Sequence, residues 1–173
     1  MIIMSKAIRH FFVYGSLRPD DDSGQSWTKS AVSGLSAQKA KLFNAKLYQE
    51  EYACAVLLDS SSSSSSKSSG CGINSNNFII GYALSTNDDE LFKEKLQLFN
   101  EIEGYHYDGS SNNLYDRTVR DVELIPSTTD SSNNNNTNSI QTRESVKAYV
   151  YHRTNQCNRK KLIPSGDWLQ RER

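Results

Sequence analysis

The residue best suited to acid–base chemistry in this sequence is Glu103, which ends an apolar segment and directly precedes Gly104. A carboxylate that follows Phe99 and Ile102 at a predicted helix end must either turn to solvent or face inward. Facing inward would desolvate the carboxylate and raise its pKa toward neutrality, where a general base works best near pH 7. The negative end of the helix dipole acts in the same direction. Glu103 is therefore the candidate catalytic residue, and an exposed surface carboxylate is the alternative.

A second candidate is the turn Tyr14-Gly15-Ser16-Leu17, which follows an apolar and aromatic run. Gly15 can adopt backbone conformations closed to other residues, so successive N–H groups could converge on an anion or an oxyanion. The sequence contains no P-loop pattern, so the turn is not a phosphate-binding motif. An ordinary connecting turn is the alternative.

Other catalytic arrangements lack the spacing that they need. Glu103 and His106 have the spacing of half a carboxylate-bridged metal site, but no second copy is visible. The three histidines, His10, His106 and His152, show neither HExxH nor paired-ligand spacing for zinc. Ser16 lies in no G-x-S-x-G elbow. We expect neither a metal site nor a serine nucleophile.

The elements that must position these residues are mostly strands. Runs of apolar, β-branched and aromatic residues predict strands, and Gly81 within one run indicates a bulge or a close backbone approach. The predicted strands cover His10–Tyr14, Ala40–Tyr48, Ala53–Asp59, Phe78–Leu84, Tyr115–Leu124 and Val146–His152. In the fifth of these, Val119, Val122 and Leu124 are predicted core contacts, with a bulge near Arg120 and Asp121.

One long helix is predicted between the fourth and fifth strands. Asn87 can cap it with Glu90 three residues on, and an apolar stripe at near-helical spacing reaches Ile102. A short helix is predicted over Gln25–Val32, and a terminal turn over Ile163–Trp168. The elements indicate a strand-dominated α+β domain with one substantial helix.

The composition indicates one domain with two polar insertions. A length of 173 residues suits a single core, and the tracts Ser60–Ser69 and Ser131–Ser139 are too polar to join it. We therefore expect one domain over 1–173 with low-complexity loop insertions at about 60–76 and 127–142. A net charge of zero with 23% charged residues lacks the basic footprint of a nucleic-acid-binding protein. A small neutral or zwitterionic ligand is the expected partner.

The cysteines and the N-terminal residues indicate the cytoplasm. Cys54, Cys71 and Cys157 are odd in number and form no CxxC pair, so a disulfide framework is not expected. The apolar stretch Met1–Met4 is too short for a signal peptide, and no apolar run is long enough for a membrane span. We expect a cytoplasmic protein that does not bind membranes.

Four sequence blocks occur in the order and approximate spacing of one known family. They are FVYGSLR at Phe12–Arg18, FNEIEG at Phe99–Gly104, YDRTV at Tyr115–Val119 and VKAYVY at Val146–Tyr151. Together they resemble the γ-glutamylcyclotransferase-like family, which includes γ-glutamylamine cyclotransferases and avirulence-induced plant relatives. The resemblance covers nearly the whole chain apart from the two polar tracts. The sequence departs from the family at Asn100, where the family usually has Asp.

The resemblance implies a fold and a site. The implied fold is a compact mixed α+β domain with a small twisted β-barrel-like sheet flanked by helices, and a substrate cavity at its mouth. By residue matching, the catalytic glutamate of the family falls on Glu103. Its substrate-holding loop falls on Tyr14, Gly15, Ser16 and Leu17.

The resemblance also implies a reaction. The α-amine of a small γ-glutamyl substrate attacks its own γ-carbonyl, giving 5-oxoproline and a free amine or amino acid, with no cofactor and no metal. Glu103 would act as base and then as acid. A non-catalytic ligand-binding or interaction module on the same scaffold is the alternative, and a related lyase or hydrolase is a third possibility. Which amine leaves, and the oligomeric state, are not fixed by the sequence.

Overall fold

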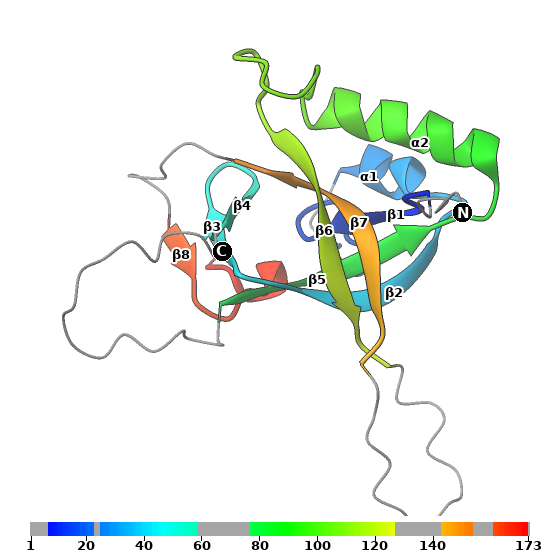
Figure 1. The fold of residues 1–173 in the computed structure, drawn as a ribbon. Coiled ribbons are helices and arrows are strands. Elements are labelled where there is room, and N and C mark those ends of the chain that lie inside the picture. The colour runs from blue at the N-terminus through cyan, green and yellow to red at the C-terminus, as the bar shows by residue number, and fades with distance from the viewer. Residues whose placement is uncertain (1–6, 23–24, 59–76, 127–142, 154–160, 173) are drawn as a thin grey trace, which may run out of the picture.

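Five strands close into a barrel, and a second sheet of three strands lies beside it (Figure 1). The computed structural model describes residues 7–22, 25–58, 77–126, 143–153 and 161–172, so both polar tracts lie outside the described residues. In barrel order the strands are β1 (His10–Val13), β5 (Phe78–Ser85), β2 (Ser36–Phe43), β6 (Asp116–Leu124) and β7 (Ser145–His152). The smaller sheet is β4 (Ala53–Leu57), β3 (Ala45–Gln49) and β8 (Lys161–Ile163). The expected α+β fold with a small closed barrel is confirmed.

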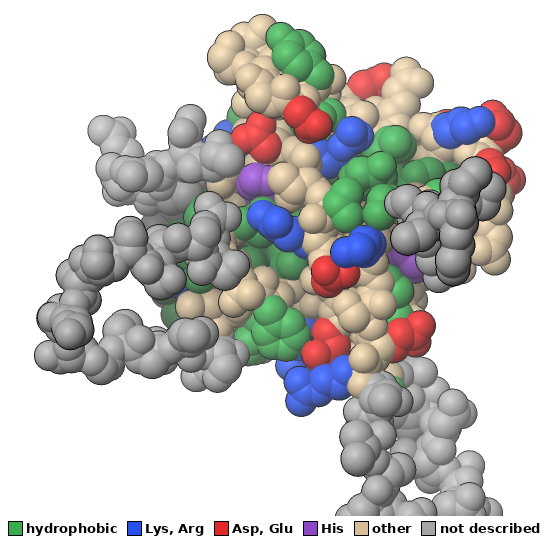
Figure 2. All heavy atoms as spheres, viewed as in Figure 1, with side chains coloured by type: hydrophobic (Ala, Val, Ile, Leu, Met, Phe, Trp, Pro, Cys, Tyr) green, Lys and Arg blue, Asp and Glu red, His purple; other side chains and the backbone are tan. Residues whose placement is uncertain are grey.

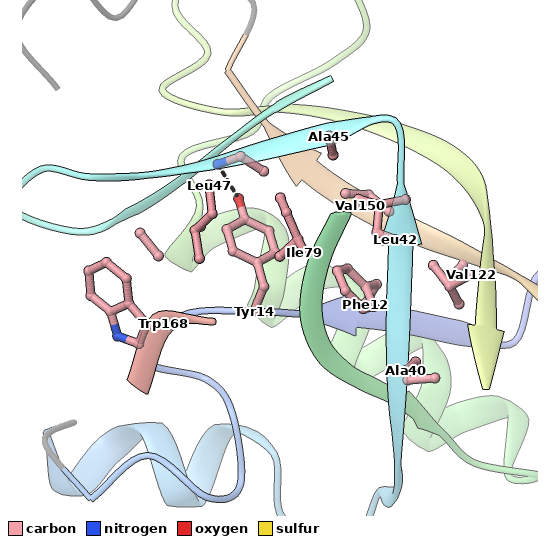
Figure 3. Close-up of a cluster of buried hydrophobic side chains, with 14 of the residues drawn as sticks. Phe12, Tyr14, Ala40, Leu42, Ala45, Leu47, Ile79, Val122, Val150 and Trp168 are labelled. Carbon is pink, nitrogen blue, oxygen red and sulfur yellow. Dashed lines mark hydrogen bonds between the residues drawn. The ribbon is translucent and has the colours of Figure 1, made fainter. Parts of the chain in front are cut away.

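The strand β1 is the centre of the fold because it is buried on both faces. Phe12 and the following Tyr14 point into the barrel, where they join a core that includes Leu42, Val122 and Val150 (Figure 3). Phe11 and Val13 point the other way, into a second core cluster under the helices. A strand covered on both sides has no polar face, which explains the unbroken apolar run in the sequence.

The barrel closes between β1 and β7, which pair in parallel with His10 opposite Ala148 and Phe12 opposite Val150. On its other edge β1 pairs antiparallel with β5. Gly81 of β5 permits a close approach here, because a Cβ atom would lie 2.3 Å from the carbonyl oxygen of Val13. The pairing of β5 with both neighbours is uninterrupted, so Gly81 marks close contact and not a bulge.

Two helices, α1 (Ser26–Ala31) and α2 (Asp89–Ile102), lie on the same side of the barrel (Figure 1). The N-cap of α2 is Asp88 and not the predicted Asn87, because the Asp88 side chain accepts hydrogen bonds from the N–H groups of Glu90 and Leu91. Phe92 and Phe99 of α2 pack against Phe11, with ring centroids 4.7 and 4.8 Å away. A 3-10 helix, η2 (Trp168–Gln170), ends the described chain.

Two of the predicted strands differ from those in the structure. The pairing of β6 with β7 runs without interruption from Asp116 to Glu123, so the predicted bulge near Arg120 and Asp121 is absent. An unbroken strand alternates faces, which places Val119 opposite to Val122 and leaves it 38% exposed. The single predicted strand over 40–48 is split at Asn44, whose φ of 55° turns the chain from the barrel into the smaller sheet.

The surface drawn in Figure 2 carries Lys and Arg side chains interspersed with Asp and Glu, without a large patch of one sign. This distribution agrees with the zero net charge of the chain. Within the described ranges, no helix combines the length and the apolar character needed to cross a membrane.

Candidate active site

A cavity of about 300 Å³ opens at the end of β1, and all five predicted site residues line it. Its wall combines the turn after β1 with the end of α2 and with residues from α1, β4 and β7. Two tyrosines, Tyr115 and Tyr151, complete the inner part of the wall. Among the described lining residues, Glu103 is the one with a charged side chain. The structure therefore brings the predicted acid and the predicted loop to one enclosed space.

Glu103 is positioned by the backbone geometry that ends α2. Its N–H group donates to the Phe99 carbonyl at 2.9 Å, and its own carbonyl accepts from the Tyr115 N–H group at 3.2 Å. Gly104 follows with a φ of 60°, the left-handed conformation that commonly ends helices and favours glycine. The chain therefore turns sharply just after Glu103 and holds this residue at the helix end, at the cavity wall.

Burial raises the pKa of Glu103 from its ordinary 4.5 to about 7. No side chain within the described part of the molecule hydrogen-bonds or ion-pairs with its carboxyl group, so nothing offsets the loss of hydration. A carboxyl group with this pKa exists in both protonation states near neutral pH, so it can accept a proton and return it.

The tyrosines around Glu103 keep their protons. Burial, followed by the nearby Glu103 charge, raises the pKa of Tyr14 well above its ordinary value. The Tyr14 hydroxyl donates to the Tyr151 carbonyl at 2.6 Å and accepts from the Ala55 N–H group at 3.3 Å, reaching from β1 toward the smaller sheet (Figure 3). The hydroxyl of Tyr14 is thus committed to the scaffold, and its ring forms cavity wall.

The turn after β1 needs glycine at position 15 for space and not for an unusual backbone conformation. The sequence suggested that Gly15 adopts a backbone conformation closed to other residues, but its φ is not in the left-handed region. A Cβ atom at Gly15 would instead lie 2.6 Å from the Cβ atom of Ala53. The Arg18 N–H group closes the turn on the Gly15 carbonyl at 3.0 Å.

Two amides of this turn have no hydrogen-bond partner among the described residues. The N–H groups of Ser16 and Leu17 make no hydrogen bond to any residue that the structure describes. The Leu17 side chain is buried in the core cluster beneath the helices, so the turn is anchored independently of these amides. Such adjacent N–H groups suit an anion or a developing oxyanion.

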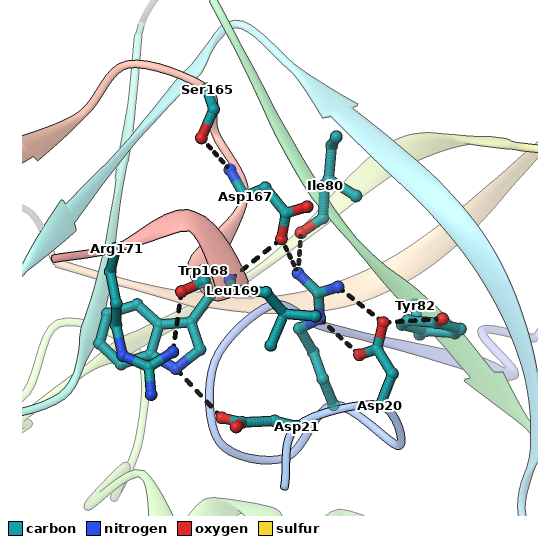
Figure 4. A network of polar contacts seen from close by, with 10 residues as sticks. Asp20, Asp21, Ile80, Tyr82, Ser165, Asp167, Trp168, Leu169 and Arg171 are labelled. Atoms are coloured by element: carbon teal, nitrogen blue, oxygen red, sulfur yellow. Dashed lines mark hydrogen bonds and ion pairs between the residues drawn. The ribbon is translucent and has the colours of Figure 1, made fainter. Parts of the chain in front are cut away.

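A buried network fixes the exit of the turn, and the sequence reading missed it. Arg18 donates twice to Asp20, at 2.9 and 2.8 Å, and once to Asp167 at 2.6 Å. Figure 4 shows Asp20, Tyr82 and Asp167 gathered around this guanidinium group. The buried Trp168 donates to Asp21 at 3.2 Å in the same network. The closeness of Arg18 to Asp20 was visible in the sequence, but its pairing with Asp167 was not.

Asn100 ties the end of α2 to the barrel. Its side-chain oxygen accepts from Arg117 at 2.8 Å and from the Tyr151 hydroxyl at 2.7 Å. The Arg117 guanidinium also lies over the rings of Tyr105 and Tyr149, at 4.4 and 4.8 Å. Arg117 therefore pairs with an amide and two aromatic rings.

Several cavity residues were not predicted as site residues. Ala53, Tyr115 and Tyr151 line the cavity and are buried, whereas Trp27, Tyr52 and Leu114 line it and are exposed, and we call the exposed side its outer part. Tyr115 and Tyr151 fall within two of the four sequence blocks that carry the family resemblance, which is a signal that could have found them. No three His, Cys, Asp or Glu side chains in the described ranges lie together as a metal-binding group.

The comparisons with known proteins assign the chain to a family. Residues 11–170 match the family described as γ-glutamyl cyclotransferase, AIG2-like. A crystal structure of an uncharacterized protein from Pyrococcus horikoshii is similar, with 20% sequence identity and a TM-score of 0.46. That similarity covers 94% of this chain and 90% of the other. No curated protein is similar enough in sequence to count as a match.

Proposed function

This chain belongs to the γ-glutamyl cyclotransferase, AIG2-like family, and from that premise we propose that it releases 5-oxoproline from a γ-glutamyl amine or amino acid. The observation that carries the proposal is the placement of Glu103. It is the one charged side chain among the described cavity residues, it has a pKa of about 7, and it shares the cavity with the free amides of Ser16 and Leu17.

The proposed reaction begins with the substrate α-ammonium group beside the Glu103 carboxylate. Glu103 takes one proton, and the free amine attacks the γ-carbonyl carbon of the same molecule. The amides of Ser16 and Leu17 bind the substrate α-carboxylate or the oxyanion that forms at the γ-carbonyl. Because nucleophile and electrophile share one molecule, the main task of the cavity is to hold the chain in a ring-forming conformer.

Collapse of the intermediate completes the reaction. The new lactam C–N bond stays, the original amide C–N bond breaks, and Glu103 returns its proton to the departing nitrogen. The attacking nitrogen loses two protons in all, and the departing amine gains two and leaves as an ammonium ion. No oxidant, reductant or second substrate is required by this balance.

Replacing Glu103 by glutamine tests the role of the acid. We expect the Glu103→Gln protein to fold normally and to form 5-oxoproline roughly 10²–10⁴-fold more slowly, because glutamine cannot carry the proton. The measurement is chromatographic detection of 5-oxoproline from γ-glutamyl amino acids and from γ-glutamyl-ε-lysine. Undiminished turnover would remove Glu103 from the proton-transfer role.

Glu101→Gln is the matched control. Glu101 lies two residues earlier on α2 and is exposed, with its carboxylate accepting from Gln97. We expect this variant to keep full turnover. If the unaltered protein binds γ-glutamyl compounds in calorimetry but forms no 5-oxoproline from any of them, the non-catalytic binding module becomes the better description.

A further inference from the structure

The outer part of the cavity is apolar and exposed. Seven large hydrophobic side chains in the described ranges are exposed, and three of them, Trp27, Tyr52 and Leu114, line this one cavity. They are 46%, 59% and 50% exposed and come from three separate segments of the chain. We name these three residues the rim. Exposed apolar side chains that converge on one cavity mark a binding surface.

The rim is directly continuous with the residues proposed to carry the chemistry. The Leu114 N–H group donates to the carbonyl of Gly104, the residue after Glu103, at 3.0 Å. Tyr52 precedes Ala53, whose side chain lies against Gly15 of the turn. A γ-glutamyl group held between Glu103 and the turn would therefore direct its amide substituent toward the rim.

Among the described residues, the rim offers no counter-ion for a charged substituent. Of the described residues that line the cavity, Glu103 alone is charged, and the reaction engages it with the α-ammonium group. Arg153 lies over the ring of Tyr115 but is held by Glu50 at 2.8 Å and by the Leu114 carbonyl at 3.1 Å. A charged group among these side chains would lose hydration without gaining a counter-ion, and contact with an exposed aromatic ring offsets only part of that loss. An alkyl or aryl group would lose only contact with water.

Resting on the proposed function, we propose that the amine released by the reaction carries an uncharged alkyl or aryl group. In the bound substrate this hydrocarbon group packs on Trp27, Tyr52 and Leu114. These three residues are then the determinants of specificity for the departing amine. Each methylene group that the rim buries stabilises the enzyme-bound transition state relative to the free substrate. Full burial of one methylene corresponds to a gain of about fourfold in kcat/KM.

A homologous series of γ-glutamyl alkylamides tests the inference. The methyl, propyl and pentyl amides are compared by kcat/KM for 5-oxoproline release, together with γ-glutamylputrescine, in which an ammonium group replaces the terminal methyl group of the pentyl amide. We expect kcat/KM to rise by about threefold to fourfold per methylene. We also expect the ammonium compound to react at least tenfold less efficiently than the pentyl amide. A flat series, or an ammonium compound that equals the pentyl amide, would overturn the inference while leaving the proposed function intact.

Rim variants assign the effect to the rim. Trp27→Ala and Tyr52→Ala should flatten the dependence of kcat/KM on the chain length of the amide. Tyr107→Ala is the matched control, because Tyr107 is 66% exposed but does not line the cavity. An equal loss of chain-length dependence in the control would exclude a specific role for the rim.

A binding measurement separates this inference from the proposed function. Calorimetric titration of the Glu103→Gln protein with the same amides needs no turnover. Affinity that rises with chain length supports the rim even if the unaltered protein forms no 5-oxoproline, in which case the proposed function alone fails. Affinity independent of chain length contradicts the rim.

Discussion

At the scale of single residues, the site depends on one carboxyl group that is half-buried at the cavity wall and has no hydrogen-bond partner among the described side chains. Glu103 is held by its backbone, and its carboxyl group is left to the cavity. A carboxylate that loses hydration without gaining a partner is costly, and the cost appears as a raised pKa. The same feature gives the group the proton affinity that the proposed reaction needs.

The raised pKa of Glu103 predicts the pH dependence of turnover. Glu103 must be ionised to take the first proton, so kcat/KM should fall about tenfold per pH unit below pH 7 and level off above it. Without the effect of burial, the same decline would begin near pH 4.5. Measuring kcat/KM from pH 4 to pH 8 distinguishes the two, and a decline centred near 4.5 would show that the carboxyl group is not desolvated in solution.

The contact between Gly15 and Ala53 predicts a rescue. Gly15→Ala should reduce kcat/KM by at least about tenfold, because the added methyl group meets the Ala53 Cβ atom at 2.6 Å and displaces the turn. Adding Ala53→Gly removes the obstructing atom and should restore most of the activity. If the double variant is no better than the single one, the requirement for glycine is not one of space.

At the scale of elements, the position of Glu103 depends on how the end of α2 is attached to β6 and β7. The backbone turn at Gly104 fixes the helix end locally. The attachment to the barrel comes from Asn100, which accepts from Arg117 of β6 and Tyr151 of β7. Movement of this attachment would move the acid relative to the turn after β1.

Arg117→Lys tests the attachment. Lysine keeps the charge but cannot lie flat between Tyr105 and Tyr149 while donating to Asn100, so we expect a loss of about 1–3 kcal/mol in the free energy of unfolding. Urea unfolding gives the measurement. Arg120→Lys, at an exposed position of the same strand, is the control and should change little. Equal effects of the two substitutions would contradict the proposed attachment.

At the scale of the whole molecule, segments near the two ends of the described chain meet beside the turn after β1. β1 pairs with β7 to close the barrel, and Arg18 beyond β1 pairs with Asp167 near the end of the chain. The Arg18 side chain is 1% exposed, so its charge depends on these carboxylate partners. The turn that is proposed to hold substrate is thus supported by residues from the opposite end of the sequence.

Asp167→Asn tests this long-range support. The substitution keeps the shape but removes the charge that Arg18 contacts at 2.6 Å, so we expect a loss of about 2 kcal/mol in stability and a higher KM for γ-glutamyl substrate. Asp121→Asn breaks an ion pair with Lys147 in which both side chains are more than half exposed, and it should cost under about 1 kcal/mol. A similar loss in both variants would show that the Arg18 network is not special.

The sequence by itself determined the features that follow from local periodicity and local chain geometry. The unbroken apolar run before Gly15 predicted a strand, and the apolar stripe before Glu103 predicted a helix that ends at this residue. The four sequence blocks also indicated the family and its barrel. Each of these signals is carried by neighbouring residues or by fixed short spacings, which survive in the sequence whatever the chain contacts elsewhere.

Only the tertiary structure decided the properties that arise between distant segments. The face occupied by Val119 follows from its register with β7, and the need for glycine at position 15 follows from the position of Ala53. The pKa of Glu103 follows from what surrounds its carboxyl group, and the partners of Arg18 and Arg117 come from other elements. Desolvation, steric exclusion and pairing all depend on distance in space, and closure of the barrel brings together residues whose separation along the chain conceals that they are neighbours.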